Sequence, residues 1–357
     1  MKRWIRLILL LALLSPPVLT QEVIENPAKP RSADAGRILE IREEMRITDE
    51  GGDFFFEYPH NVKVAPDGSI FLADRDLMLR FDKDGSFLHN FFKKGQGPGE
   101  MIYLRDYAFH DSKLFVIGSN PDKFLIYDFG GELLDEVVLH DAPIFMDFKF
   151  MAGGRLYFVK NEPPEVADKP DVFDAPHVLI SMDQAGQNLE EHLSLPYQFF
   201  VTGGAMSGLG RLTGAFFQDR YWIITHTEEY LVKLFDVGSQ TLVRSFHRKY
   251  RRVKPPEDYR WPGIYGRDGK RMGPPPPEFV NDISAIYVVN DLIWVRTSTR
   301  DEDKGYLVDV FDLEGVYQDY FYLNTSGRII GTHGDRIFIQ ESDEDELLSI
   351  VKYRVLG

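Results

Sequence analysis

The stretch Pro59-His60-Asn61-Val62-Lys63-Val64-Ala65-Pro66-Asp67-Gly68-Ser69-Ile70-Phe71-Leu72-Ala73-Asp74 decides the fold class of this chain. It holds two short apolar runs on either side of an Asp-Gly turn. Gly and Asp tolerate the positive φ that tight hairpin turns require, so the stretch predicts two antiparallel strands. A third run ends in Phe81-Asp82, before another turn at Gly85. The unit is therefore strand, tight turn, apolar strand, third strand and a Gly turn.

Five further copies of this unit follow along the 357 residues. Their first strands are predicted at residues 107–109, 148–151, 214–217, 285–289 and 329–332. Six units over residues 50–357 average about fifty residues each, which is a typical length for propeller blades. After the first twenty residues, no long window keeps the apolar spacing of an amphipathic helix. We therefore predict an all-β, six-bladed propeller, and the alternative is a pair of β-sandwich sheets or a mixed array.

The two chain ends suggest how the ring closes. The sixth unit runs out of chain after its third strand, at about residues 348–355. A spare strand, at about residues 38–47, comes before the first unit. We predict that this N-terminal strand completes the last blade as its outer strand, because closure removes exposed sheet edges. The propeller domain would then cover residues 37–357.

A family resemblance supports this interpretation. The stretch from Pro59 to Asp74 resembles an NHL-type repeat, as does its continuation through Phe81-Asp82-Lys83-Asp84-Gly85 and Gly95-Gln96-Gly97-Pro98-Gly99-Glu100. From about Ile38 onward, the chain resembles secreted bacterial six-bladed propellers of this NHL-like group. The resemblance implies a ring with ligands at one end of its central channel. In the wider superfamily it implies either non-catalytic recognition or, in a few members, lactonase or lyase activity.

Residues 1–20 are typical of a secretory signal peptide. Basic residues come first, an apolar run covers residues 7–14, and Ser-Pro-Pro ends it. The apolar run is about half of the ~20 residues that a membrane-spanning helix needs, although an uncleaved membrane anchor is the alternative. Residues 21–36 contain Pro27, Pro30 and Gly36 and are expected to form a flexible leader. The expected location is periplasmic or extracellular, in a bacterium.

Composition excludes several functional classes. The chain has no cysteine, which rules out disulfides, thiolate metal sites and cysteine nucleophiles. Its net charge of −15 argues against a nucleic-acid partner, because phosphate binding needs clustered positive charge. The nine histidines show no zinc-binding spacing, and no complete catalytic motif occurs. We expect no catalytic residue and no cofactor, and calcium is the metal that best suits a propeller channel.

Polar residues near the starts of the innermost strands are the candidate ligand site. Aligning the units on their tight turns places five residues there: Asn61, Arg105, Asp147, Asp282 and Arg328. Together they could orient a small polar ligand at one mouth of the channel. The alternative is that these charges pair with one another around a water-filled channel.

Two insertions interrupt the repeat, at about residues 161–177 and 250–279. The second is locally basic on an acidic protein and contains Arg252, Trp261 and Tyr265, residue types that are common in contact surfaces. It is predicted to be a lid or a partner-docking loop, and the alternative is surface decoration without a function.

These features predict an exported, monomeric, non-catalytic propeller that binds a small polar ligand or an envelope protein, with no membrane contact after signal cleavage. One alternative is a divalent-metal-dependent lactonase or lyase-type enzyme. In that enzyme Asp147 and Asp282 would serve as ligands or bases, and Asn61 or His60 would help to hold the metal. A second alternative is a scaffold within a cell-envelope complex.

Overall fold

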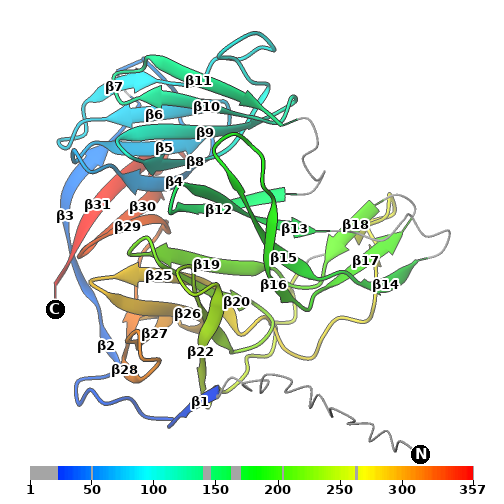
Figure 1. Ribbon diagram of the computed structural model, residues 1–357. Helices are drawn as coiled ribbons and strands as arrows, with labels where there is room; N and C mark the ends of the chain where they lie inside the picture. Colours follow the sequence, from blue (N-terminus) through cyan, green and yellow to red (C-terminus); the bar gives the residue numbers. More distant parts are fainter. Residues whose placement is uncertain are drawn as a thin grey trace, which may run out of the picture.

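The computed structural model describes residues 23–49, 51–139, 146–161, 170–202, 205–261 and 264–356. The predicted signal peptide lies outside these ranges. Within them, every regular element is a β-strand, and the strands form sheets that radiate from a central axis (Figure 1). None of the described segments is a helix of the length and hydropathy that would let it cross a membrane.

The six blades follow the predicted repeat, each with its innermost strand first. Blade 1 has β4 (Pro59–Val64), β5 (Ile70–Asp74), β6 (Leu77–Phe81) and β7 (Phe87–Asn90); blade 2 has β8 (Tyr103–His110), β9 (Lys113–Ser119), β10 (Lys123–Asp128) and β11 (Leu133–Val138); blade 3 has β12 (Met146–Ala152), β13 (Arg155–Asn161), β15 (His177–Asp183) and β16 (Glu190–Leu195). Blade 4 has β19 (Leu212–Phe217), β20 (Tyr221–His226), β21 (Val232–Asp236) and β22 (Thr241–Arg248); blade 5 has β25 (Ile283–Val289), β26 (Leu292–Asp301), β27 (Gly305–Phe311) and β28 (Tyr317–Leu323); blade 6 has β29 (Arg328–His333), β30 (Arg336–Ser342), β31 (Leu348–Leu356) and β3 (Glu40–Ile47). The six-bladed fold class is therefore confirmed.

The last blade is completed by the N-terminal strand, as predicted. β3 pairs antiparallel with β31, from Glu40 opposite Leu356 to Ile47 opposite Ile350. Figure 1 shows this junction as a blue strand beside a red one. Ile47 and Ile350 are both almost fully buried, so the junction is sealed by side-chain packing as well as by backbone hydrogen bonds.

Part of the predicted flexible leader, residues 21–36, forms a strand instead. β1 (Val23–Asn26) pairs parallel with β22, and β2 (Arg37–Ile38) pairs parallel with β28. The segment thus adds a fifth strand to blades 4 and 5. The physical reason is that the outermost strand of a blade has unpaired N–H and C=O groups, which an extended segment with little pattern of its own can satisfy.

Aromatic rings fill the space between neighbouring blades. Between blades 1 and 2, the ring of Phe71 lies 4.9 Å from that of Phe109. Between blades 3 and 4, Phe150 and Phe216 stack with centroids 4.1 Å apart. Adjacent blades diverge with distance from the axis, and large side chains fill the space between them. This packing explains why a chain of this kind is rich in aromatic residues, here with 27 phenylalanines and 17 tyrosines.

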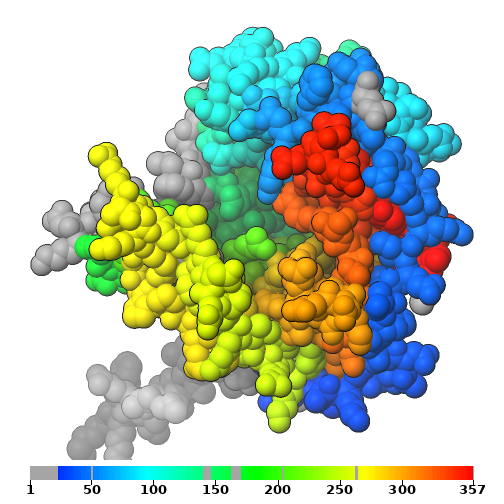
Figure 2. Space-filling model, turned by 180° about the vertical axis from the view of Figure 1, so that it is seen from behind, coloured from blue at the N-terminus to red at the C-terminus, as the bar shows by residue number. Residues whose placement is uncertain are grey.

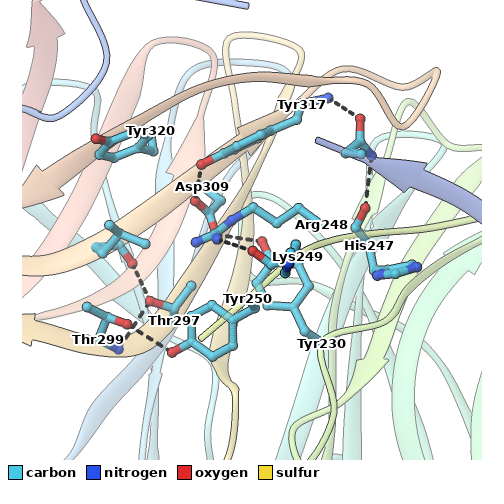
Figure 3. A network of polar contacts seen from close by, with 12 residues as sticks. Tyr230, His247, Arg248, Lys249, Tyr250, Thr297, Thr299, Asp309, Tyr317 and Tyr320 are labelled. Atoms are coloured by element: carbon cyan, nitrogen blue, oxygen red, sulfur yellow. Dashed lines mark hydrogen bonds and ion pairs between the residues drawn. The ribbon is translucent and has the colours of Figure 1, made fainter. Parts of the chain in front are cut away.

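A buried polar network joins blades 4 and 5 (Figure 3). Asp309 has no exposed surface, and its carboxylate accepts hydrogen bonds from the Tyr230 and Tyr317 hydroxyls, both at 2.6 Å. Arg248 Nε donates to the same carboxylate at 2.8 Å. Burial, together with the Asp309 charge, raises the pKa of both tyrosines well above 10. They therefore stay neutral donors, and the buried charges are paired and bonded, as buried charges must be.

Both insertions carry strands of their own and lie beside the same mouth of the channel. The first contributes β14 (Asp171–Asp174), which forms a small sheet with β17 (Gln198–Thr202) and β18 (Ala205–Gly208) (Figure 1). The second contributes the hairpin β23 (Ile264–Tyr265) and β24 (Arg271–Met272). Most residues of the second insertion are drawn in yellow in Figure 2, next to a hollow bordered by the orange and red segments of blades 5 and 6.

Candidate functional site

The central channel contains two cavities that join near its middle. One, of about 800 Å³, lies where the innermost strands begin, and the other, of about 860 Å³, lies toward their far ends. The residues that line both are Asn61, Lys63, Asp106, Lys149, Gly214, Ala215 and Phe216. We call the first cavity the basic mouth, for its charge. It is large enough for a small-molecule ligand.

Positive charge is concentrated in the basic mouth. Its five lysines and arginines are Lys63, Lys149, Arg211, Arg296 and Arg328, and Asp106 is the one acid among the described residues that line it. The chain as a whole carries a net charge of −15. This cavity therefore has the opposite sign to its protein, and its walls focus that field on whatever enters.

The single acid of the basic mouth, Asp106, already has protein partners. Asp106 Oδ1 accepts a hydrogen bond from the Asn61 side-chain amide and lies 3.3 Å from Lys63 Nζ. Lys63 also donates to the backbone carbonyl of Tyr107, and its Nζ lies 4.5 Å from the centre of the Tyr107 ring. These contacts neutralise one cation and leave four.

The other four cations have no carboxylate partner among the residues that the structure describes. Arg211 Nη2 donates to the backbone oxygen of Ser284 at 2.7 Å. Arg328 donates to the Tyr58 hydroxyl at 2.8 Å and to Gln340 Oε1 at 3.0 Å. Neutral acceptors orient these guanidinium groups without cancelling their charge. The side chain of Lys149 has no hydrogen bond or ion pair to any described residue.

Arg296 has a buried donor without an acceptor. It reaches the basic mouth from β26, the second strand of blade 5, and its guanidinium carbon lies 4.0 Å from the centre of the Tyr306 ring. Its Nε is buried and makes no hydrogen bond within the described residues. An unsatisfied buried N–H is costly, and a bound acceptor would remove that cost.

The predicted site residues separate into two groups. Asn61 and Arg328 line the basic mouth. Arg105 instead donates to the Met146 carbonyl at 3.1 Å and faces Asp122 at 3.5 Å, between blades 2 and 3. Asp147 is exposed and lines neither channel cavity. Asp282 is buried outside the channel, where it accepts a hydrogen bond from Arg252 Nε at 2.8 Å.

A bulge near the start of the innermost strand explains the displacement of Arg105. β8 has one extra residue between Leu104 and Asp106, so the register with β9 shifts there. A one-residue shift moves a side chain to the other face of a strand. Asp106, the neighbour of the predicted residue, therefore lines the channel.

Alignment of the turns did not identify Lys63, Lys149, Arg211 or Arg296. A signal was present for two of them. Lys149 stands between Phe148 and Phe150 in the run Phe148–Ala152, which is otherwise apolar, and Arg296 follows the apolar run Leu292–Val295 in a second strand. A lone cation in an apolar strand is an interruption that needs a polar environment. Arg211 precedes its strand and has no such signal.

The metal-dependent alternative lacks its predicted constellation. Asp147 and Asp282 do not meet Asn61 or His60 at the channel, for the reasons given above. In the part of the chain that is described, no three His, Asp or Glu side chains are grouped so that they could hold a metal ion.

The predicted partner-loop residues lie on the second insertion. Arg252 connects that insertion to the rest of the ring through Asp282 and through the backbone oxygen of Glu228, 2.9 Å away. Tyr265 donates its hydroxyl to the Trp261 carbonyl, and the Trp261 ring packs against Tyr259 at 4.9 Å. The insertion therefore has internal structure, and its role as a docking surface stays a prediction.

Comparisons with known proteins agree with the fold. The model of the DUF5128 family, described as a 6-bladed beta-propeller, matches residues 50–177. A Bacteroides fragilis protein described as exported superimposes with a TM-score of 0.57 at 12% identity, over 94% of this chain and 100% of its own. A DUF4221 family member from Bacteroides vulgatus also gives 0.57, at 9% identity, over 90% and 99%. No curated protein matches the sequence. At these identities the likeness shows the fold alone.

Proposed function

We propose that this six-bladed propeller is an exported, non-catalytic binding protein whose basic mouth takes a small anionic ligand, a carboxylate or phosphate compound. The main support for this proposal is that four cations of one cavity have no carboxylate partner among the described residues. Export is supported by the N-terminal signal pattern.

Electrostatics favours an anion over a neutral ligand. Two of the unpaired cations are arginines held by neutral acceptors, Arg211 and Arg328, and these contacts fix their orientation before any ligand arrives. Preorganised donors lose little side-chain entropy on binding. A third, Arg296, has an unsatisfied Nε. A ligand oxygen would recover the free energy that these groups lose on partial burial.

Calorimetric titration of the purified chain with citrate and with inorganic phosphate tests this function. We expect at least one of these anions to bind, and higher salt to weaken the binding. Lys149→Gln and Arg211→Gln should each weaken it about tenfold, the loss of one charge-assisted hydrogen bond.

Lys113→Gln is the matched control, because Lys113 is exposed and lines neither channel cavity. It should leave the affinity unchanged. Absence of binding by either anion, or equal weakening in the control and in the mouth variants, would overturn the proposal.

A further inference from the structure

A third cavity lies beside the basic mouth, outside the central channel. It has a volume of about 480 Å³ and lies between the small sheet of the first insertion, the turn from β20 to β21 and the second insertion. We call it the side pocket. It is lined by Asp174, Pro196, Tyr197, Gln198, His226, Glu228, Glu229, Arg252, Pro277, Phe279 and Asn281.

The side pocket combines ring-bearing and hydrogen-bonding side chains, and its lining contains no Ala, Val, Leu, Ile or Met. The rings belong to Pro196, Tyr197, His226, Pro277 and Phe279, and the other six lining residues are acids, amides and one arginine. Flat apolar surfaces therefore stand next to donors and acceptors. A ligand that fits such walls has an apolar face and a polar rim.

The ring walls are rigid. Tyr197 is buried, donates its hydroxyl to the Gly210 carbonyl and stacks on His177 with centroids 3.9 Å apart. His177 Nδ1 and His226 Nε2 are hydrogen bonded at 3.2 Å. Stacking and hydrogen bonds hold these side chains in one arrangement, so binding would not have to order them.

Several polar groups of the side pocket remain available. The carboxylates of Glu228 and Glu229 make no hydrogen bond or ion pair with described residues, and both residues are exposed. Asn281 donates its amide N–H to Thr227 Oγ1 at 2.9 Å, which leaves its amide oxygen as an acceptor. Carboxylates and amides of this kind accept from, or donate to, neighbouring hydroxyl groups.

The side pocket and the basic mouth are neighbours, because one residue, Thr227, is hydrogen bonded to a residue of each. Thr227 Oγ1 accepts a hydrogen bond from the backbone N–H of Arg211, which belongs to the basic mouth, at 3.1 Å. The same oxygen accepts from Asn281, which belongs to the side pocket. The two cavities therefore share a wall at Thr227, and a ligand of several rings would have to cross this wall to reach both.

We propose that the side pocket binds a hydroxylated sugar ring, and that the ligand of the whole site is an acidic saccharide whose carboxylate enters the basic mouth. A pyranose ring has flat C–H faces that pack on aromatic rings and a rim of hydroxyls that bond to carboxylates and amides. The anionic part of this inference rests on the proposed function, whereas the ring subsite rests on the side pocket alone.

Exposed aromatic side chains extend the same surface. In the described ranges, the exposed phenylalanine and tyrosine side chains are Phe55, Tyr58, Tyr103 and Tyr259. Tyr259 lies in the second insertion, whereas Phe55 and Tyr58 precede β4 and Tyr103 begins β8, so these three lie where the chain enters an innermost strand. This is the end of the strands at which the basic mouth opens, and further rings of a saccharide could stack there.

The test compares three probes of similar length: a trimer of galacturonic acid, a trimer of aspartic acid and maltotriose. The acidic sugar should bind the purified chain about tenfold more tightly than the acidic peptide, because only the sugar uses both cavities. Phe279→Ala and Glu228→Gln should remove that advantage and leave peptide binding unchanged. Glu344→Gln, an exposed acid on the β30–β31 loop, is the matched control and should change nothing.

Each outcome decides one of the two proposals. Equal affinity for the two acidic trimers, with no effect of either side-pocket variant, overturns the saccharide and leaves the anion site standing. Agmatine, an organic cation, serves as a fourth probe. If agmatine binds and Glu228→Gln removes that binding, the side pocket is a cation site and the saccharide is again overturned. If neither acidic trimer binds, the anion function fails, and maltotriose binding that Phe279→Ala abolishes would still support the ring subsite. The side chain of Glu228 makes no hydrogen bond or ion pair with described residues, so the Glu228→Gln variant stays informative if Phe279→Ala fails to fold.

Discussion

At the scale of single residues, the histidines of the interface between blades 3 and 4 are unusual because they are buried as a pair. His177 and His226 are 6% and 8% exposed and contact each other through their rings. Burial lowers the pKa of His177 to about 3 and that of His226 to about 4, and nearby Lys149 and Lys233 act in the same direction. Both imidazoles are therefore neutral in the folded protein at every pH near neutrality.

This pairing predicts a loss of stability on mild acidification. In the unfolded chain each histidine binds a proton below about pH 6.5, whereas the folded pair resists protonation until pH 3 to 4. Their contribution is thus complete above pH 6.5 and falls as the pH drops toward 4. The expected slope is about 1.4 kcal/mol per pH unit for each histidine, on linkage grounds. Urea unfolding at pH 7, 6 and 5 measures it.

The variant His177→Asn/His226→Gln should flatten this slope. Substitution of the exposed His333 by Gln should preserve the slope. A double variant that is as sensitive to pH as the parent chain would show that other groups control acid stability.

At the scale of elements, the N-terminal segment fastens three consecutive blades. β1 lies on blade 4, β2 on blade 5 and β3 in blade 6. Asn26, at the end of β1, is buried, and its amide N–H groups donate to the carbonyls of His247 at 3.0 Å and Gly315 at 2.9 Å. Its amide oxygen accepts from the Tyr317 N–H at 2.9 Å. One side chain therefore replaces three missing backbone partners across a blade boundary.

Asn26→Ala should lower the free energy of unfolding by about 2–3 kcal/mol, because it leaves buried backbone groups without partners. Glu25→Ala, one residue earlier on the same strand and strongly exposed, is the matched control and should change stability by less than about 0.5 kcal/mol. Urea unfolding of both variants checks this. Equal stability of the two would mean that β1 is held by its strand pairing alone.

At the scale of the whole molecule, closure places the opposite charges of the chain in different regions. The ring brings six innermost strands around one axis, so cations that are far apart in sequence, such as Lys149 and Arg328, line the same cavity. The excess of acids lies elsewhere. Loss of closure would therefore affect stability and the basic mouth together.

Two truncated chains test closure directly. A chain that begins at residue 37 keeps β3 and should unfold in one cooperative transition, at a lower temperature than the full chain. A chain that begins at residue 48 exposes the edge of β31 and uncovers Ile350, and should aggregate or lose cooperativity. Thermal unfolding and size-exclusion chromatography distinguish these outcomes. Cooperative unfolding of the shorter chain at the temperature of the longer one would refute the role of β3.

Most of the fold could be predicted because the residues at the tight turns mark where each strand of the repeat ends. Gly68, Gly85, Gly131, Gly186 and Gly315 all adopt positive φ at the turns where the repeat places them. The role of the spare N-terminal strand was also predictable. The sixth unit has three strands where a blade needs four, so one strand had to come from elsewhere in the chain. Asn61 and Arg328 were found in the basic mouth by the same alignment of turns.

Local sequence alone determined the number of blades, the order of strands and the sealing of the ring. Only the tertiary structure decided which side chains line the channel, because a bulge of one residue in β8 moved Arg105 aside and left Asp106 there. It also decided that Val23–Asn26 and Arg37–Ile38 form strands, because the free edges of β22 and β28 supply hydrogen-bond partners that these segments themselves do not encode. The physical reason is common to both: hairpin turns depend on neighbours in sequence, whereas register and edge pairing depend on neighbours in space.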